Sequence, residues 1–331
     1  MHPELAVSGT ATQDASRVQV REEAFVSVIV PVVDRKDDLL TVYREFEAEL
    51  RSRSLEYEFI FVFDGGFTSP PEDLVELSHA TRELRIIQFE RTFGESAALR
   101  AGVEHSRGNL IATVPAYFQV RPEGIHALLD ELLESTVDLI VTRRAPRADG
   151  WWNRLQSRAF HCVVNKLSGF TFRDMGCGLR LMRREIAESL PVYGDLHRFI
   201  PAIAVREGYR VKEVDVPQHP LDARRRVYRP GVYVRRLLDI IAFFFLAKFT
   251  DKPLRFFGLV GLFLSATGAL IGCIVLIQRL AGQGIANRPM LLLSVLLFTL
   301  GAQVLGLGLI GEIIVHLRSQ QRSAYKVRDT T

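Results

Sequence analysis

The amino-acid sequence predicts an α/β protein: a doubly wound, mostly parallel sheet, followed by an interfacial helix and a two-helix transmembrane hairpin. Apolar runs typical of strands alternate with helical stripes from residue 25 to residue 142, and this alternation is typical of parallel sheets covered by helices. Residues 256–277 and 290–311 contain no Asp, Glu, Lys or Arg. At about 1.5 Å per residue each segment is roughly 33 Å long, enough to cross a hydrocarbon core of about 30 Å.

The first half of the chain contains the elements of the sheet. The run at residues 25–32 is mostly apolar and rich in β-branched residues, as expected of a strand covered on both faces. Four further strands are predicted at residues 58–63, 85–89, 109–114 and 137–142. Helices with an apolar stripe are predicted between them, at residues 37–53, 71–84, 95–106 and 122–135.

The pattern weakens after residue 150. Residues 151–168 suggest a mixed helix, and the glycine-rich residues 174–180 suggest a loop. A helix is expected at residues 195–207, and the alternation at residues 209–216 predicts a half-exposed strand.

The charges that flank the hairpin predict its orientation. Lys248, Lys252 and Arg255 precede the first span, and several Lys and Arg residues follow the second, whereas the loop between them carries only Arg279 and Arg288. Lys and Arg accumulate on the cytoplasmic side of membrane proteins. We therefore expect a multi-pass protein of the inner or plasma membrane, with the N-terminal domain in the cytoplasm.

These features divide the chain into five parts. Residues 1–23 are polar, lack the apolar core of a signal peptide, and are expected to be disordered. Residues 24–230 form the cytosolic domain, and residues 231–252 a juxtamembrane helix whose aromatic cluster favours a position in the lipid interface. A third membrane span is the alternative for that helix, but its uncharged stretch is short. Residues 253–317 form the hairpin and residues 318–331 a cytosolic tail.

The excess of positive charge is local. The chain has 331 residues and a formal net charge of +4, and residues 224–236 contain six arginines and no acid. Anionic lipid next to the membrane attracts such residues, so a lipid phosphate is a better partner than nucleic acid. The alternative is a topology signal without a ligand. Three cysteines without close spacing indicate neither a disulfide framework nor a zinc site.

Small residues recur in the two apolar spans. Gly268 and Gly272 lie four residues apart in the first, and four glycines occur in the second. Such residues let helices approach closely, so we expect the hairpin to pack on itself or on a second copy of the chain, as a homo-oligomer. Lipid-facing glycines are the alternative.

Ligands of parallel sheets bind beyond the carboxyl ends of the strands, and motifs there carry a family resemblance. The chain resembles the family 2 glycosyltransferases that act on polyprenyl phosphates, the type of dolichyl-phosphate mannose synthase and the undecaprenyl-phosphate sugar transferases. The resemblance rests on Val28–Val32, Tyr57–Gly66, Arg91–Gly102, Asp174–Arg183, Arg198–Ile203, Gly208–Pro217 and Lys252–Gly258. It implies a GT-A fold, a nucleotide-sugar donor, a polyprenyl-phosphate acceptor at the membrane, and a role in making cell-envelope glycans or modifying lipids.

The sequence departs from this family where acids are expected. The family's Asp-Asp-Gly-Ser appears here as Phe63 followed by Asp64, Gly65 and Gly66. In its Asp-x-Asp stretch, positions 115, 117 and 120 are Pro, Tyr and Val, Arg121 replaces a proline, and Arg35 stands where a Glu is expected. Because Mg²⁺ or Mn²⁺ is usually held by one or two carboxylates plus phosphates, the metal of the family is in doubt, no metal ligands are assigned, and the cofactor is left open.

Candidate roles follow from the resemblance and, for Arg121, which replaces a proline of the family, from the charge that the leaving diphosphate requires. Catalytic roles fall on Asp64, Arg121 and Arg180. Donor-binding positions are Pro31, Val33, Asp34, Asp64, Gly65, Arg91, Gly94 and Gln119. Positions for the acceptor phosphate are Arg180, Arg224, Arg225, Arg226 and Tyr228.

Two interpretations follow from these departures. In the first, the chain is a working transferase in which arginines stabilise the departing nucleoside diphosphate in place of a metal. In the second, the site has decayed and the chain is a membrane-anchored lipid-phosphate binding or assembly partner. Donor binding that survives EDTA would favour the first.

Overall fold

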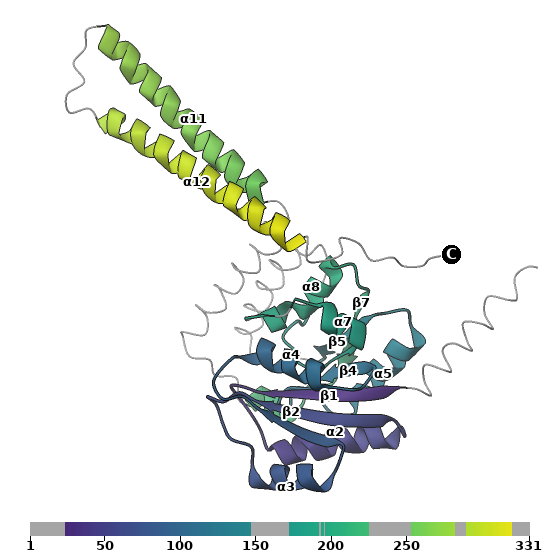
Figure 1. The fold of residues 1–331 in the computed structure, drawn as a ribbon. Coiled ribbons are helices and arrows are strands. Elements are labelled where there is room, and N and C mark those ends of the chain that lie inside the picture. The colour runs from purple at the N-terminus through teal and green to yellow at the C-terminus, as the bar shows by residue number, and fades with distance from the viewer. Residues whose placement is uncertain are drawn as a thin grey trace, which may run out of the picture. The chain divides into compact units, whose positions relative to one another are not determined.

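The computed structural model describes residues 24–146, 172–191, 193–194, 196–224, 253–281 and 289–319. The chain separates into two compact units, Met1–Phe243 and Phe244–Thr331. The first holds the sheet and its helices, and the second holds two long helices (Figure 1).

Seven strands in the described residues form one mixed sheet. They are β1 (Phe25–Val32), β2 (Glu56–Phe63), β3 (Leu84–Gln88), β4 (Leu110–Thr113), β5 (Leu139–Arg144), β6 (Arg180–Arg183) and β7 (Val211–Val216). Their order is β3-β2-β1-β4-β6-β5-β7. All neighbouring pairs are parallel except the two that include β6, which runs antiparallel to β4 and β5. This confirms the predicted, mostly parallel α/β sheet.

Helices cover both faces of the sheet. They are α2 (Leu39–Ser52), α3 (Glu72–Ala80), α4 (Glu95–His105), α5 (Gly124–Glu134), α7 (Arg184–Ser189), the 3₁₀ helix η1 (Leu196–Phe199), α8 (Ile200–Arg206) and α9 (Pro220–Arg224). On one face α2 packs against β2 and α5, and on the other α4 packs against β1, β2 and α7 (Figure 1). Buried apolar side chains of β1, β2, α2 and α5 form the core between them.

Strand β6, like the short helices α7 and α9, is not predicted by the sequence. It begins at Arg180, the last of the glycine-rich residues 174–180, which the sequence predicts to be a loop. Its four residues are too few to show a strand period, and arginines stand at both of its ends. Its strand character comes from pairing with β4 and β5 on either side, which local sequence does not reveal.

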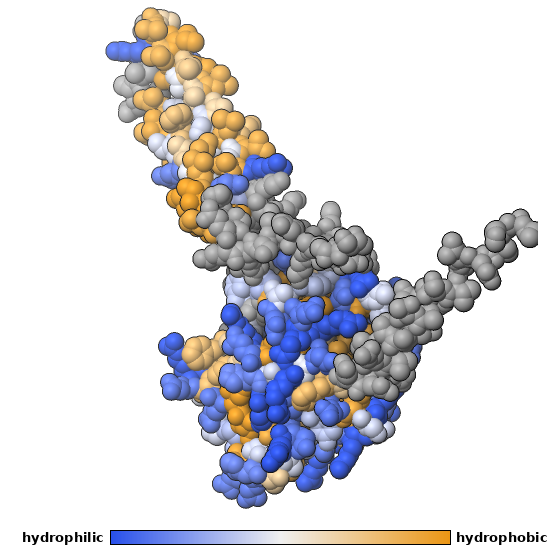
Figure 2. Space-filling view, turned by 45° about the vertical axis from the view of Figure 1, so that its right-hand side comes forward, coloured by the Kyte–Doolittle hydropathy of each residue, from blue (hydrophilic) through white to orange (hydrophobic). Residues whose placement is uncertain are grey.

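The C-terminal unit contains α11 (Pro253–Leu280) and α12 (Pro289–Ser319), both longer than the predicted spans. Pro253–Leu280 and Pro289–Val315 are long and apolar enough to cross a membrane, and at most 17% of either apolar window is buried. Figure 2 shows apolar side chains over the surface of this unit, whereas hydrophilic side chains dominate the visible face of the sheet domain. The core helix of a soluble protein would instead be mostly buried.

Glycines bring α11 and α12 into contact. A Cβ atom added to Gly268 would lie 2.5 Å from the backbone nitrogen of Phe298, and one added to Gly301 would lie 2.6 Å from the carbonyl oxygen of Gly261. The hairpin therefore packs on itself through small residues, as one of the predicted alternatives states. Association between copies of the chain stays a prediction.

Several predictions fall on segments that the structure does not describe. They concern the disordered tail at residues 1–23, the mixed helix at 151–168, the interfacial helix at 231–252 and the cytosolic tail beyond residue 319. Arg225, Arg226 and Tyr228 lie outside the described residues as well.

Candidate active site

The strand order of the sheet reverses between β1 and β4, and this switch point is called the crevice below. From β1 the chain builds the sheet outward through β2 and β3, and β4 then returns to the opposite side of β1. The β1·β4 pairing ends at Ile29 and Thr113, whereas the β1·β2 pairing continues to Val32 and Phe63. Such a switch point, outside the carboxyl ends of the strands, is where ligands of open α/β sheets bind.

Pro31 helps to open this crevice. The carbonyl oxygen of Ile29 accepts a hydrogen bond from the N–H of Val114 on the β4 side. Because hydrogen-bonding direction repeats every second residue along a strand, position 31 faces the same side, where proline has no N–H to donate. Pro31 is buried at the base of the crevice, and Val33 and Asp34 follow it into the loop.

The loops after β1 and β4 are joined. The backbone N–H of Asp37 donates to the carbonyl oxygen of Ala116 at 2.9 Å, and the Asp37 carboxylate accepts from the N–H of Phe118 at 3.1 Å. Between these bonds, the Arg35 guanidinium lies 4.0 Å from the centre of the Tyr117 ring. This stacking is a cation–π contact. Two of the positions where the resemblance expects acids, 35 and 117, therefore contact each other.

Gln119 connects these loops to the glycine-rich segment. Its Oε1 accepts a hydrogen bond from the N–H of Gly178 at 2.7 Å, and its Nε2 donates to the hydroxyl of Tyr117 at 2.6 Å. The first bond fixes the orientation of the amide, since only the oxygen can accept. Gln119 is buried, so it acts here through Tyr117.

A group of charged side chains lies near the start of α4. His197 Nε2 lies 3.1 Å from Glu95 Oε2. Burial opposes ionisation of Glu95, but the hydrogen bond from His197 and the charges of His197, Arg180 and Arg198 outweigh it and lower the pKa of Glu95. Desolvation and the nearby Glu95 charge raise the pKa of Asp34. Glu95 and Asp34 thus belong to one electrostatic cluster, which sequence reasoning did not identify.

Arg180 is buried beneath this cluster. Its Nη1 donates to the carbonyl oxygen of His197 at 3.0 Å and its Nη2 to that of Met175 at 3.5 Å. Its Nε has no hydrogen-bond partner among the described residues. Burial lowers the pKa of Arg180. The structure brings it close to Glu95, and its role at an acceptor phosphate stays a prediction.

Asp64 is directed into the protein. It is fully buried, and its two carboxylate oxygens accept hydrogen bonds from the N–H groups of Phe93 at 2.7 Å and Gly94 at 3.1 Å. Gly94 has a φ of +86°, a left-handed conformation that favours glycine. A Cβ atom at Gly65 would lie 2.2 Å from the carbonyl oxygen of Phe89. Asp64 and Gly65 therefore hold the loop that carries Arg91.

Arg91 and Arg121 are exposed at the rims of their loops. The Arg91 guanidinium lies 4.9 Å from the centre of the Phe93 ring. The backbone N–H of Arg121 donates to the carbonyl oxygen of Pro217 at 3.0 Å. Neither side chain forms an ion pair with the described residues, so both are open to solvent and ligand.

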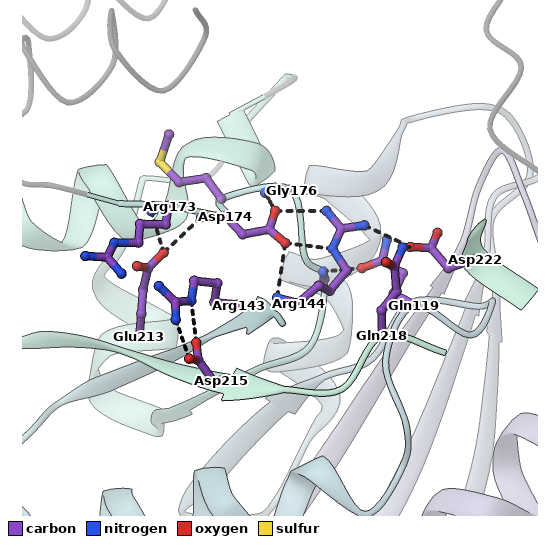
Figure 3. A network of polar contacts seen from close by, with 12 residues as sticks. Gln119, Arg143, Arg144, Arg173, Asp174, Gly176, Glu213, Asp215, Gln218 and Asp222 are labelled. Carbon is purple, nitrogen blue, oxygen red and sulfur yellow. Dashed lines mark hydrogen bonds and ion pairs between the residues drawn. The ribbon is translucent and has the colours of Figure 1, made fainter. Parts of the chain in front are cut away.

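A buried network of ion pairs connects the glycine-rich segment with α9 (Figure 3). Arg144, at the end of β5, donates two hydrogen bonds to Asp174 at 2.7 and 2.8 Å and one to Asp222 at 3.1 Å. All three side chains are at most 3% exposed. The network joins the glycine-rich loop to α9, which ends at Arg224 and leads into the arginine run. Asp174 was visible within a motif, but nothing in the sequence singled out Arg144.

The carboxylates of the site do not form a divalent-metal site. Such ions prefer several oxygen ligands, usually including one or two carboxylates. Asp64 binds backbone amides and Glu95 is paired with His197, which leaves Asp34, a single carboxylate whose pKa is raised by desolvation and by Glu95. Within the described ranges, no group of three or more His, Cys, Asp or Glu side chains could hold a metal ion. The residues present therefore do not fit the Mg²⁺ or Mn²⁺ that the resemblance implies.

Comparison with known proteins decides the family. The profile described as Glycosyl transferase family 2 matches residues 27–190, which include the loops of the crevice. The chain is also 30% identical over 313 residues to dodecaprenyl-phosphate galacturonate synthase of Rhizobium johnstonii, an alignment that covers 92% of each protein. The chain belongs to glycosyl transferase family 2.

Other proteins similar to this family 2 glycosyltransferase are consistent with the family assignment. It is 28% identical over 306 residues to undecaprenyl-phosphate 4-deoxy-4-formamido-L-arabinose transferase of Pseudomonas savastanoi pv. phaseolicola, covering 90% of this chain and 88% of that one. Among solved structures it resembles glucosyl-3-phosphoglycerate synthase from Mycobacterium tuberculosis in complex with UDP, with a TM-score of 0.53, 15% identity, and coverage of 75% of this chain and 86% of the other. This likeness shows the GT-A type of fold.

Proposed function

We propose that the chain transfers a sugar from a nucleotide-sugar donor to the phosphate of an undecaprenyl-type polyprenyl lipid, for cell-envelope glycan synthesis or lipid modification. The supporting observation is the match over nine-tenths of the chain to two enzymes whose names specify a polyprenyl phosphate and a sugar. At this coverage the alignments include at least part of the apolar hairpin as well as the sheet domain. A chain with both parts can hold a soluble donor next to a membrane-embedded acceptor.

The chemistry is a displacement at the anomeric carbon of the sugar. A phosphate oxygen of the lipid forms the new bond to this carbon, and the bond to the nucleoside diphosphate breaks. The attacking phosphate is already anionic near neutral pH, so it needs little help from a general base. The larger requirement is to stabilise the charge that accumulates on the leaving diphosphate.

The proposed roles are those that the resemblance and the charges of the sequence suggest. The donor binds in the crevice near Pro31, Val33, Asp34, Gly65, Arg91, Gly94 and Gln119. Asp64 holds the loop at the donor side, and Arg121, exposed at the rim, approaches the transferred group. Arg180 and the run Arg224, Arg225, Arg226 and Tyr228 bind the acceptor phosphate, because clustered guanidinium groups suit phosphate oxygens.

We propose that the hairpin makes this a multi-pass protein of the inner or plasma membrane, with the transferase domain in the cytoplasm. Two helices of sufficient length and the Lys and Arg residues at both outer flanks support this orientation. Nucleotide sugars are cytoplasmic metabolites, so the donor would meet the crevice on that side. The membrane, the number of passes and the orientation are parts of this proposal.

The second interpretation, a decayed site in a binding partner, is not favoured. The named relatives are enzymes, and the loops of this chain form an ordered constellation of charged and aromatic side chains. A transfer assay separates the two. The full-length protein in detergent is incubated with a panel of labelled nucleotide sugars and undecaprenyl phosphate, with and without EDTA, and label in the lipid phase is measured.

We expect one donor to yield labelled lipid, and the triple substitution of Arg224, Arg225 and Arg226 by Ala to abolish transfer while nucleotide binding persists. A chain that transfers no sugar from any donor of the panel, with or without divalent metal, would contradict the proposed function.

A further inference from the structure

Arg35 is a cation at the switch point without an anionic partner. Its guanidinium is stacked on the Tyr117 ring, between the ends of β1 and β4. One of its terminal nitrogens, Nη2, is buried and has no hydrogen-bond partner among the described residues. No carboxylate pairs with Arg35 in this part of the chain. A buried N–H donor without a partner is costly, and a bound anion would satisfy it.

The Tyr117 hydroxyl has a proton to donate into the same space. The Gly178 N–H fixes the Gln119 amide so that its Nε2 donates to the Tyr117 oxygen. With this bond accepted, the tyrosine's own O–H can point elsewhere. Desolvation and the Glu95 charge raise the pKa of Tyr117, so the hydroxyl keeps its proton at neutral pH.

The charged side chains around Arg35 carry an excess of positive charge, which favours the binding of an anion. Glu95 is paired with His197 and lies close to Arg180 and Arg198. The arginines of the cluster, with Arg35 added, outnumber its two carboxylates, Glu95 and Asp34. Two of the positions in these loops where the resemblance expects acids are here Arg35 and Tyr117. Where acids would bind a divalent metal ion, this chain instead presents the positively charged guanidinium of Arg35.

We propose that Arg35, seated on Tyr117, binds the diphosphate of the nucleotide-sugar donor together with the Tyr117 hydroxyl, and supplies the charge that a divalent ion would supply. This inference rests on the proposed function for the identity of the donor. A guanidinium offers a planar pair of N–H donors that match two phosphate oxygens. Stacking on the ring fixes its orientation before the donor binds, which lowers the entropic cost of the contact.

Arg35 would also act during transfer. The bond between the anomeric carbon and the diphosphate oxygen breaks with both electrons going to that oxygen, while the lipid phosphate oxygen forms the new bond. The charge that develops on the leaving diphosphate is stabilised by the fixed guanidinium. The step requires no proton transfer and no oxidant or reductant.

The test measures binding of inorganic pyrophosphate and of the common ribonucleoside diphosphates to the full-length protein in detergent by calorimetry, with EDTA present. We expect binding of at least one nucleoside diphosphate, with an affinity that EDTA does not change. Arg35→Lys keeps the charge but loses the planar fork, and Arg35→Ala loses both. We expect weaker binding by about tenfold for Lys and about a hundredfold for Ala, and a smaller loss for Tyr117→Phe.

Arg82→Ala is the matched control. Arg82 is exposed and lies just before the amino end of the edge strand β3, whereas the crevice lies at the carboxyl ends of β1 and β4, so its replacement should leave the affinity unchanged. Thermal unfolding of each variant shows whether it remains folded, and the conservative Lys and Phe substitutions test the idea even where Ala destabilises the loop.

The outcomes separate this inference from the proposed function. Binding that disappears with EDTA and returns with Mg²⁺ or Mn²⁺ would overturn the role of Arg35, as would unchanged affinity in folded Arg35→Lys and Arg35→Ala variants, or no diphosphate binding at all. Metal-free, Arg35-dependent binding without any transfer to a polyprenyl phosphate would support the inference and contradict the function instead.

Discussion

Glu58 is a carboxylate buried in the middle of β2, and its partners explain why it is tolerated there. It accepts hydrogen bonds from the Ser27 hydroxyl at 2.7 Å and from the backbone N–H and Nε of Arg107 at 2.5 and 3.2 Å. Burial opposes its ionisation, but these bonds and the charge of Arg85 lower the pKa of Glu58 below its ordinary value of 4.5. Each partner lies on a different segment, so Glu58 ties β1, β2 and the turn after α4 together.

We predict that Glu58→Gln destabilises the protein at pH 7 by about 2 kcal/mol, because charge-assisted bonds become neutral ones. A group whose pKa falls on folding stabilises the fold above its ordinary pKa and loses this effect as the pH falls through its folded value. The difference between wild type and variant should therefore narrow below about pH 4.5. Urea unfolding at several pH values measures it; a pH-independent difference would exclude this electrostatic account.

At the scale of elements, consecutive arginines at the end of β5 have different environments. Arg144 is buried between Asp174 and Asp222, whereas Arg143 forms a partly exposed ion pair with Asp215 (Figure 3). Replacing one member of a buried ion network leaves uncompensated charge in the interior. An exposed pair is screened by water and contributes little.

We predict that Arg144→Met destabilises the protein by about 3–5 kcal/mol, whereas Arg143→Met, the matched control, changes its stability by at most about 1 kcal/mol. Denaturant unfolding of the full-length protein in detergent provides the comparison. Equal effects of the two substitutions would mean that the Arg144 network does not hold the glycine-rich loop to α9.

The hairpin depends on backbone contact between its helices. A Cβ at Gly301 would lie 2.3 Å from Ser265 Oγ and 2.5 Å from its nitrogen, whereas a Cβ at Gly306 would have nothing within 4 Å. We predict that Gly301→Val separates α11 from α12 and lowers the thermal stability of the protein in detergent, and that Gly306→Val does not. If Gly306→Val were equally damaging, Gly306 would contact something other than the described part of the hairpin, such as a second copy.

At the scale of the whole molecule, the proposed topology predicts which residues a membrane-impermeant thiol reagent can reach. In intact cells, with the three native cysteines replaced by Ser, a cysteine at Gly284 in the loop between the helices should be labelled from outside. A cysteine at Ser323 should be labelled only after the membrane is opened, since the positive flanks stay in the cytoplasm. Labelling of Ser323→Cys in intact cells would reverse the orientation.

The predictable parts of the fold were those encoded in short stretches of sequence. The five strands of the first half and the helices between them agree with the structure to within a few residues at their ends, and the two apolar spans lie within α11 and α12, the second of which continues to Ser319. Strand β6 was missed, because pairing with β4 and β5 creates it. Of the candidate site, the loops were found from strand ends and motifs, but Glu95, His197 and Arg144 were not, since their partners lie far away in the chain.

The fold class, the two apolar helices long enough to cross a membrane and the family motifs were determined by the sequence itself, since apolar periodicity, span length and local residue order are properties of neighbouring residues. Only the tertiary structure decided which contacts are made by the residues that differ from the family pattern and by their neighbours. It turned Asp64 toward backbone amides, buried Arg144 between two acids, and placed Arg35 on Tyr117. The loops that meet there are joined by the bond between Asp37 and Phe118, 81 residues apart, and such contacts exist only once the strand order brings β1 beside β4.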